Sequence, residues 1–159
     1  MKKYEFTGET KEIKLLFRTA VLHRIRATVS FGFVKIGDLG GWIEKEENLS
    51  HEGKAWVCGD AEVCGNAKVW GNAEVFSASH VLVIGAIGSR NDFTTFYRDK
   101  DNEITVKCGC FLGKIDRFLE KVTQTHGDSK YALVYRAAVE VAKLQIDLSG
   151  EAPKDADEE

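Results

Sequence analysis

Residues 53–82 read GKAWVC-GDAEVC-GNAKVW-GNAEVF-SASHVL, five consecutive groups of six residues that share one pattern. Glycine or serine opens each group, alanine or serine stands third, and valine stands fifth. The third and fifth side chains point to the same face of a strand, because side chains alternate along an extended chain. The Gly-Asn or Gly-Asp pair supplies the positive φ of a tight corner. The spacing therefore predicts short strands joined by corners into a triangular coil, with the valines inside.

The pattern resembles the hexapeptide-repeat, left-handed β-helix family. In that family an aliphatic residue is followed four positions later by a small one, as Val57 is by Ala61 and Val63 by Ala67. The resemblance implies the left-handed coil. The alternative is an ordinary meander of strands, which the strict spacing disfavours because it leaves no room for hairpin turns. We therefore expect a β-rich α+β fold: a short left-handed β-helix with an N-terminal β region and a C-terminal ββαα cap.

Four regions follow from this pattern. We expect residues 1–40 to form the N-terminal β region, 41–82 the β-helix, and 83–148 the C-terminal α+β cap. Residues 149–159 are an acidic tail without large apolar residues, and we expect this tail to be disordered.

The flanks carry recognisable strand and helix patterns. Apolar residues recur at helical spacing over 114–126, and a second apolar helix is expected over 129–147. Strands are expected at Lys3–Thr7, Ile13–Phe17, Leu22–Val29, 81–87, 93–98 and 103–108.

Composition narrows the function classes. The net charge is −3, so the chain lacks the basic excess of a general nucleic-acid binder. It has no long apolar run and no secretory signal, so we expect a cytoplasmic protein without membrane contact. In a reducing cytoplasm its four cysteines are not expected to form disulfides. Cys108-Gly-Cys110 has no second pair at zinc-ligand spacing, so neither a metal nor a cofactor is expected.

Trimer formation is expected on stability grounds. Two or three coils bury little apolar area, and hexapeptide-repeat proteins are typically trimers. Trp56, Trp70 and Phe76 occupy outward or corner positions of the repeat. Large exposed aromatics mark interfaces, so we expect these three residues to hold a homotrimer.

Longer stretches resemble accessory proteins encoded by bacteriophages and prophages, a family without an assigned reaction. These stretches are KYEFTGETKEI, GDLGGWIEKEENLS, GDAEVCGNAKVWGNAEV, IGSRNDFTTFY and THGDSKYALVYRAAVE. The resemblance implies a non-enzymatic protein that counters host defence in the bacterial cytoplasm. It would bind a defence protein, as anti-CRISPR inhibitors do, or sequester a nucleotide signal.

Two enzyme classes remain as alternatives to a binding protein. Hexapeptide-repeat acyltransferases use a histidine base and CoA, and His80 is the histidine inside the clear repeat. The short coil and the absence of a long loop in the repeat disfavour this reading. A carbonic anhydrase of this fold needs three histidines around zinc, and the sequence lacks the close histidine pair.

The candidate recognition surface combines a glycine-flanked polar loop with a later cluster of cations and tyrosines. The loop can present backbone N–H groups and a guanidinium to an anion, and Arg90 is its strongest member. The plain alternative is a polar turn without function. The predicted ligand- or partner-binding residues are Ser89, Arg90, Asn91, Thr94, Lys130, Tyr131 and Arg136.

Overall fold

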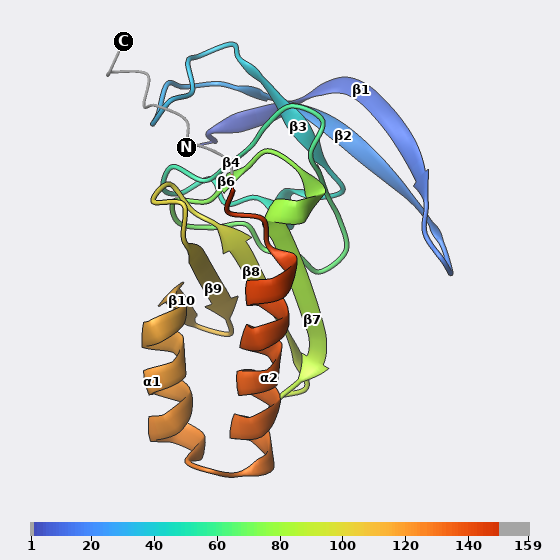
Figure 1. The fold of residues 1–159 in the computed structure, drawn as a ribbon. Coiled ribbons are helices and arrows are strands. Elements are labelled where there is room, and N and C mark those ends of the chain that lie inside the picture. The colour runs from blue at the N-terminus through green and yellow to red at the C-terminus, as the bar shows by residue number, and fades with distance from the viewer. Residues whose placement is uncertain (1, 150–159) are drawn as a thin grey trace.

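The computed structural model describes residues 2–149. In this part of the chain the strands form three separate sheets, none of which closes on itself, followed by two helices. Figure 1 shows the N-terminal strands and the repeat at one end of the molecule, and the helices at the other. Except for its first residue, the predicted disordered tail at 149–159 lies outside the described residues.

The first sheet has the order β1-β2-β3-β5. β1 (Tyr4–Lys14) and β2 (Thr19–Ala27) form a long antiparallel hairpin, which curves away from the body in Figure 1. Two separate strands were predicted where β1 runs unbroken. The register shifts at Gly8, which has a φ of 93°, so this glycine makes a bulge and not a turn.

The repeat forms strands of only two residues each. β3 (Leu39–Ile43) pairs in parallel with β5 (Glu62–Val63), whereas β4 (Trp56–Val57) pairs in parallel with β6 (Glu74–Val75) in a sheet of their own. The prediction of a left-handed β-helix over 41–82 is therefore wrong. β4 and β6 pair with each other inside the repeat, whereas β5 pairs with β3, which precedes the repeat, so the repeat units join different sheets.

The facing of the repeat side chains is only partly as predicted. The third-position alanines and fifth-position valines from Ala55 to Val75 are at most 3% exposed and fill one core, as expected. Alternation along a strand would turn the fourth side chain of each group outward, away from the valines, which is wrong for Trp56 and Glu74, at 2% and 4% exposed. Trp56 lies beneath Tyr4 and Phe31 of the N-terminal region. These contacts with distant segments override the local alternation.

A buried lysine joins the N-terminus to the repeat. Lys3 is 3% exposed, and its Nζ donates to the carbonyl oxygen of Ala55 at 2.7 Å and lies 4.8 Å from the centre of the Phe31 ring. Burial lowers the pKa of Lys3 to about 8, because the charged form loses hydration.

Stability should therefore rise with pH above about 8 through Lys3. Between that pH and its ordinary pKa of 10.5, the unfolded state binds the proton and the folded state does not. We expect the difference in unfolding free energy between the wild type and Lys3→Met to shift by on the order of 1 kcal/mol, in favour of the wild type, from pH 7.5 to 9.5. Urea unfolding at both pH values measures this shift, and titrations of other residues cancel in the difference. A pH-independent difference would contradict it.

The C-terminal sheet has the order β10-β9-β8-β7 and is antiparallel throughout. It comprises β7 (Val81–Ile87), β8 (Asp92–Arg98), β9 (Ile104–Cys108) and β10 (Phe111–Lys114). The first three agree closely with the predicted strands, and β10 was missed.

Two helices complete the fold. α1 (Ile115–His126) and α2 (Lys130–Gln145) confirm the two predicted helices within two residues at each end. Both pack against the C-terminal sheet and make a second core, which includes Phe96, Val106 and Phe118. The first core holds the repeat, so each end of the molecule has its own hydrophobic centre.

Candidate ligand-binding pocket

Two hairpin turns and one helix enclose a pocket of about 210 Å³. The β7–β8 turn, the β9–β10 turn and the C-terminal half of α1 supply most of its walls, and α2 contributes one tyrosine. The lining residues are Ser89, Arg90, Asp92, Cys108, Gly109, Cys110, Phe111, Phe118, Lys121, Val122, Thr125, His126 and Tyr135.

The floor of the pocket is apolar and aromatic. The ring centres of Phe111 and Phe118 are 5.4 Å apart, and Phe118 meets Tyr135 edge-on at 5.6 Å. Phe118 and Val122 are each 3% exposed, because the amphipathic face of α1 places them against the sheet. A ligand in this pocket would therefore find a rigid hydrophobic surface beneath it.

Tyr135 fixes the β7–β8 turn against α2. Gly88 has a φ of 78°, and a Cβ added there would lie 1.8 Å from the Tyr135 hydroxyl oxygen. Only glycine fits beneath this hydroxyl. Burial raises the pKa of Tyr135 to about 12, and its hydrogen bond with the Cys108 thiol acts in the same direction. The hydroxyl therefore stays protonated at neutral pH and remains a hydrogen-bond donor.

Basic side chains surround the opening. Arg90, Lys121 and His126 all line the pocket, and Arg90 Nη1 lies 3.6 Å from the point where a Gly109 side chain would begin. Within residues 2–149, Arg90 and Lys121 form neither a hydrogen bond nor a salt bridge. The one acid, Asp92, accepts a hydrogen bond from the Phe93 backbone N–H at 2.7 Å. The lining thus carries two cations, Arg90 and Lys121, and one carboxylate, Asp92, so its net charge is positive above an apolar floor.

The predicted loop residues fall into three situations. Ser89 and Arg90 line the pocket, as a recognition role requires. Asn91 has a φ of 48° and serves the turn. Thr94 is 1% exposed, and its hydroxyl donates to the Cys108 sulfur at 3.4 Å, so it supports the pocket from behind.

The predicted residues of α2 do not line the pocket. Arg136 donates to the Gly127 carbonyl oxygen at 2.9 Å and to the Thr123 hydroxyl at 3.3 Å, so it ties α2 to the end of α1. Tyr131 lies beside His126, with 5.7 Å between ring centres, and is 45% exposed. Lys130 is exposed at the first position of α2.

The candidate catalytic histidine has a contact within the chain. Nδ1 of His80 accepts a hydrogen bond from the backbone N–H of Phe76 at 3.0 Å. Burial, and then the charge of Arg98, lower the pKa of His80. Its imidazole therefore helps to order the end of the repeat.

The aromatics predicted for a trimer interface also pack within the chain. The Lys107 ammonium lies 4.6 Å from the Trp70 ring centre, and Phe76 contacts Phe33 at 5.9 Å. Trp70 and Phe76 keep some exposed surface, whereas Trp56 keeps almost none. Trp56 is therefore unsuited to an interface.

Sequence reasoning missed several lining residues. Phe111 was not predicted because β10 was missed. The Cys108–Phe111 hairpin turn, which places Phe111 against α1, was not recognised either. Gly109, with a φ of 58°, was the available signal, since glycine at the first central position marks a two-residue hairpin turn. Lys121 looked like an ordinary solvent-facing residue of an amphipathic helix.

Two features are absent from residues 2–149. No group of three or more His, Cys, Asp or Glu side chains in this part is placed to hold a metal ion. None of its helices has the length and apolar character needed to cross a membrane. The chain matches no protein-family model, and it matches no curated protein.

Proposed function

We propose that this chain is a non-enzymatic binding protein that takes a small organic anion into the pocket between the two hairpin turns and α1. The observation that carries the proposal is the pairing of two cations, Arg90 and Lys121, with an apolar floor. Within residues 2–149 neither cation forms a salt bridge, and Asp92 is the one carboxylate of the lining, so the remaining positive charge suits an anionic group. The floor of Phe111 and Phe118 suits a flat or apolar ligand body.

The polar groups of the pocket suit the binding of an anion better than the catalysis of a reaction. A guanidinium offers two parallel N–H donors to phosphate or carboxylate, and Lys121 adds a point charge. Burial keeps the Tyr135 hydroxyl protonated at neutral pH by raising its pKa, and the Cys108 sulfur accepts a hydrogen bond from the Thr94 hydroxyl at 3.4 Å. His80, the candidate base of an acyltransferase, accepts the Phe76 N–H. These contacts favour a binding protein over an acyltransferase that uses CoA.

A nucleotide signal has the required chemistry, since it joins an aromatic base to phosphate. The proposal is thus compatible with the role that the resemblance to phage accessory proteins implies, namely antagonism of host defence in the bacterial cytoplasm. A host protein that presents an acidic side chain beside an aromatic one would suit the same pocket. The net charge and the apolar floor of this concave pocket favour a small ligand over a host protein, because small-molecule sites are concave and mostly apolar.

Replacing Arg90 with alanine should weaken the binding of phenyl phosphate roughly tenfold, the scale of a lost charge-assisted hydrogen bond. Phenyl phosphate is the probe because it joins one anionic group to one aromatic ring. The melting temperature should hardly change, because Arg90 is exposed. Isothermal titration calorimetry and thermal unfolding measure the two quantities.

Arg117→Ala is the matched control, because Arg117 is an exposed cation of α1 outside the pocket lining. It should bind phenyl phosphate as the wild type does. Benzyl alcohol, which lacks the charge, should bind much more weakly than phenyl phosphate. Equal binding by wild type and Arg90→Ala, or no binding at millimolar phenyl phosphate, would refute the proposed site.

A further inference from the structure

The tip of the β1–β2 hairpin presents large apolar side chains to solvent. Leu16 is 88% exposed and Phe17 is 94% exposed, at the turn closed by the Leu15 N–H and the Arg18 carbonyl. Lys14 stands beside them and forms no salt bridge within residues 2–149. Figure 1 shows the hairpin projecting from the body, so this tip is free to enter another surface.

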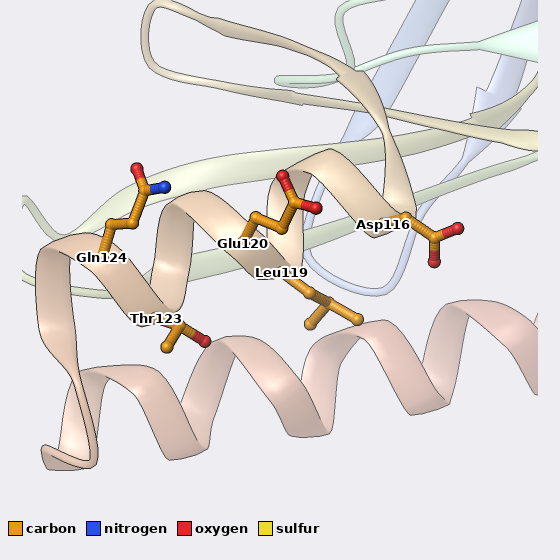
Figure 2. A pocket seen from close by; sticks show the side chains of 5 residues that line it. All are labelled: Asp116, Leu119, Glu120, Thr123 and Gln124. Carbon is orange, nitrogen blue, oxygen red and sulfur yellow. The ribbon is translucent and has the colours of Figure 1, made fainter.

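A groove on α1 has the complementary character. Five residues line a space of about 450 Å³: Asp116, Leu119, Glu120, Thr123 and Gln124. Figure 2 shows these side chains along one stretch of α1, with Leu119 extending toward α2. Neither Asp116 nor Glu120 forms a salt bridge with any other residue of 2–149. The groove therefore combines an apolar centre with two uncompensated acids.

The two features match in polarity and charge. The tip carries an apolar pair beside a lysine, and the groove combines a leucine with two carboxylates. Burial of Leu16 and Phe17 would drive the contact, since hydrophobic burial dominates association. The charges would set its orientation, because exposed ion pairs contribute little energy but select the partner.

The tip and the groove cannot meet within one molecule. The hairpin projects from one side of the molecule, and α1 lies on the other side (Figure 1). We propose that the tip of one copy of this chain docks into the α1 groove of a second copy, with Lys14 beside Asp116 and Glu120. This contact joins two different surfaces, so repetition gives a closed ring or an open chain. It is independent of the ligand pocket.

The oligomeric state of two double variants tests the proposal. Leu16→Ser/Phe17→Ser removes the apolar tip, and Asp116→Lys/Glu120→Lys reverses the charge of the groove. Light scattering during size-exclusion chromatography should give an assembly for the wild type at tens of micromolar. Each double variant should elute as a monomer of 17.7 kDa. Ile36→Ser, which replaces another exposed apolar residue, should assemble as the wild type does.

A mixing experiment identifies the contact. The tip variant retains an intact groove, and the groove variant retains an intact tip. An equimolar mixture can therefore form one contact and should elute at twice 17.7 kDa. Because all four substituted positions are solvent-exposed, circular dichroism should show folded proteins.

Three results would overturn the proposal. They are a monomeric wild type across this concentration range, an assembly that survives in either double variant, and a mixture that stays monomeric.

Discussion

Replacing Arg98 with methionine is expected to lower the free energy of unfolding by about 3–5 kcal/mol, the scale for breaking a buried ion pair from one side. Arg98 is 1% exposed, and its Nη1 lies 3.6 Å from the Glu74 carboxylate. It also donates to the Glu74 carbonyl oxygen at 3.1 Å and to Asn102 at 2.8 Å. Methionine keeps the bulk but leaves the Glu74 charge buried beside the first core.

Urea unfolding at pH 7 measures this effect. Arg26→Met is the matched control, since Arg26 forms an exposed pair with Glu5 at 2.7 Å. An exposed pair contributes about 1 kcal/mol or less. Combining Arg98→Met with Glu74→Leu should recover part of the loss, because both charges of this pair are then removed. If Arg98→Met costs no more than Arg26→Met, Arg98 does not hold the repeat to the C-terminal sheet.

Trp56→Ala is expected to cost about 3–5 kcal/mol of stability, the usual loss for truncating a large buried aromatic side chain. The indole contacts the rings of Tyr4 and Phe31 at 6.5 and 5.4 Å. It also lies against the backbone at Gly40, where an added Cβ would meet it at 2.7 Å. Removing it leaves a cavity shared by the N-terminal sheet and the repeat.

Denaturant unfolding monitored by circular dichroism checks this loss. Trp56→Phe should retain more of the stability, because a smaller ring still fills part of the cavity. A Trp56→Ala variant with wild-type stability and an altered assembly would restore the interface role that the repeat pattern suggested.

Sequence patterns over a few residues correctly predicted the features that depend on neighbouring residues. The alanines and valines of the repeat point inward because alternation and glycine corners act within six residues. The two helices follow from their apolar spacing. Sheet assembly also depends on pairing with segments outside the repeat, such as Trp42 of β3 with Glu62 of β5. The six-residue pattern does not encode those outside partners, so the predicted β-helix was wrong.

The residues of the candidate site also divide into those that a local pattern predicts and those that only the fold brings together. Arg90 was found because a polar turn between glycines interrupts an apolar strand. Lys121 and Phe118 join it only because α1 folds back over the sheet, which the sequence does not state. Arg136 looked like a recognition residue, but its contacts close the loop between the helices.

The packing of Tyr135 against Gly88 has a kinetic consequence for ligand binding. Because this contact restricts the β7–β8 turn to few conformations, the turn loses little conformational entropy when a ligand binds. Binding should then proceed without a slow rearrangement, and its rate should rise linearly with ligand concentration. The same contact makes position 88 intolerant of any side chain, because the tyrosine and the turn cannot both keep their places.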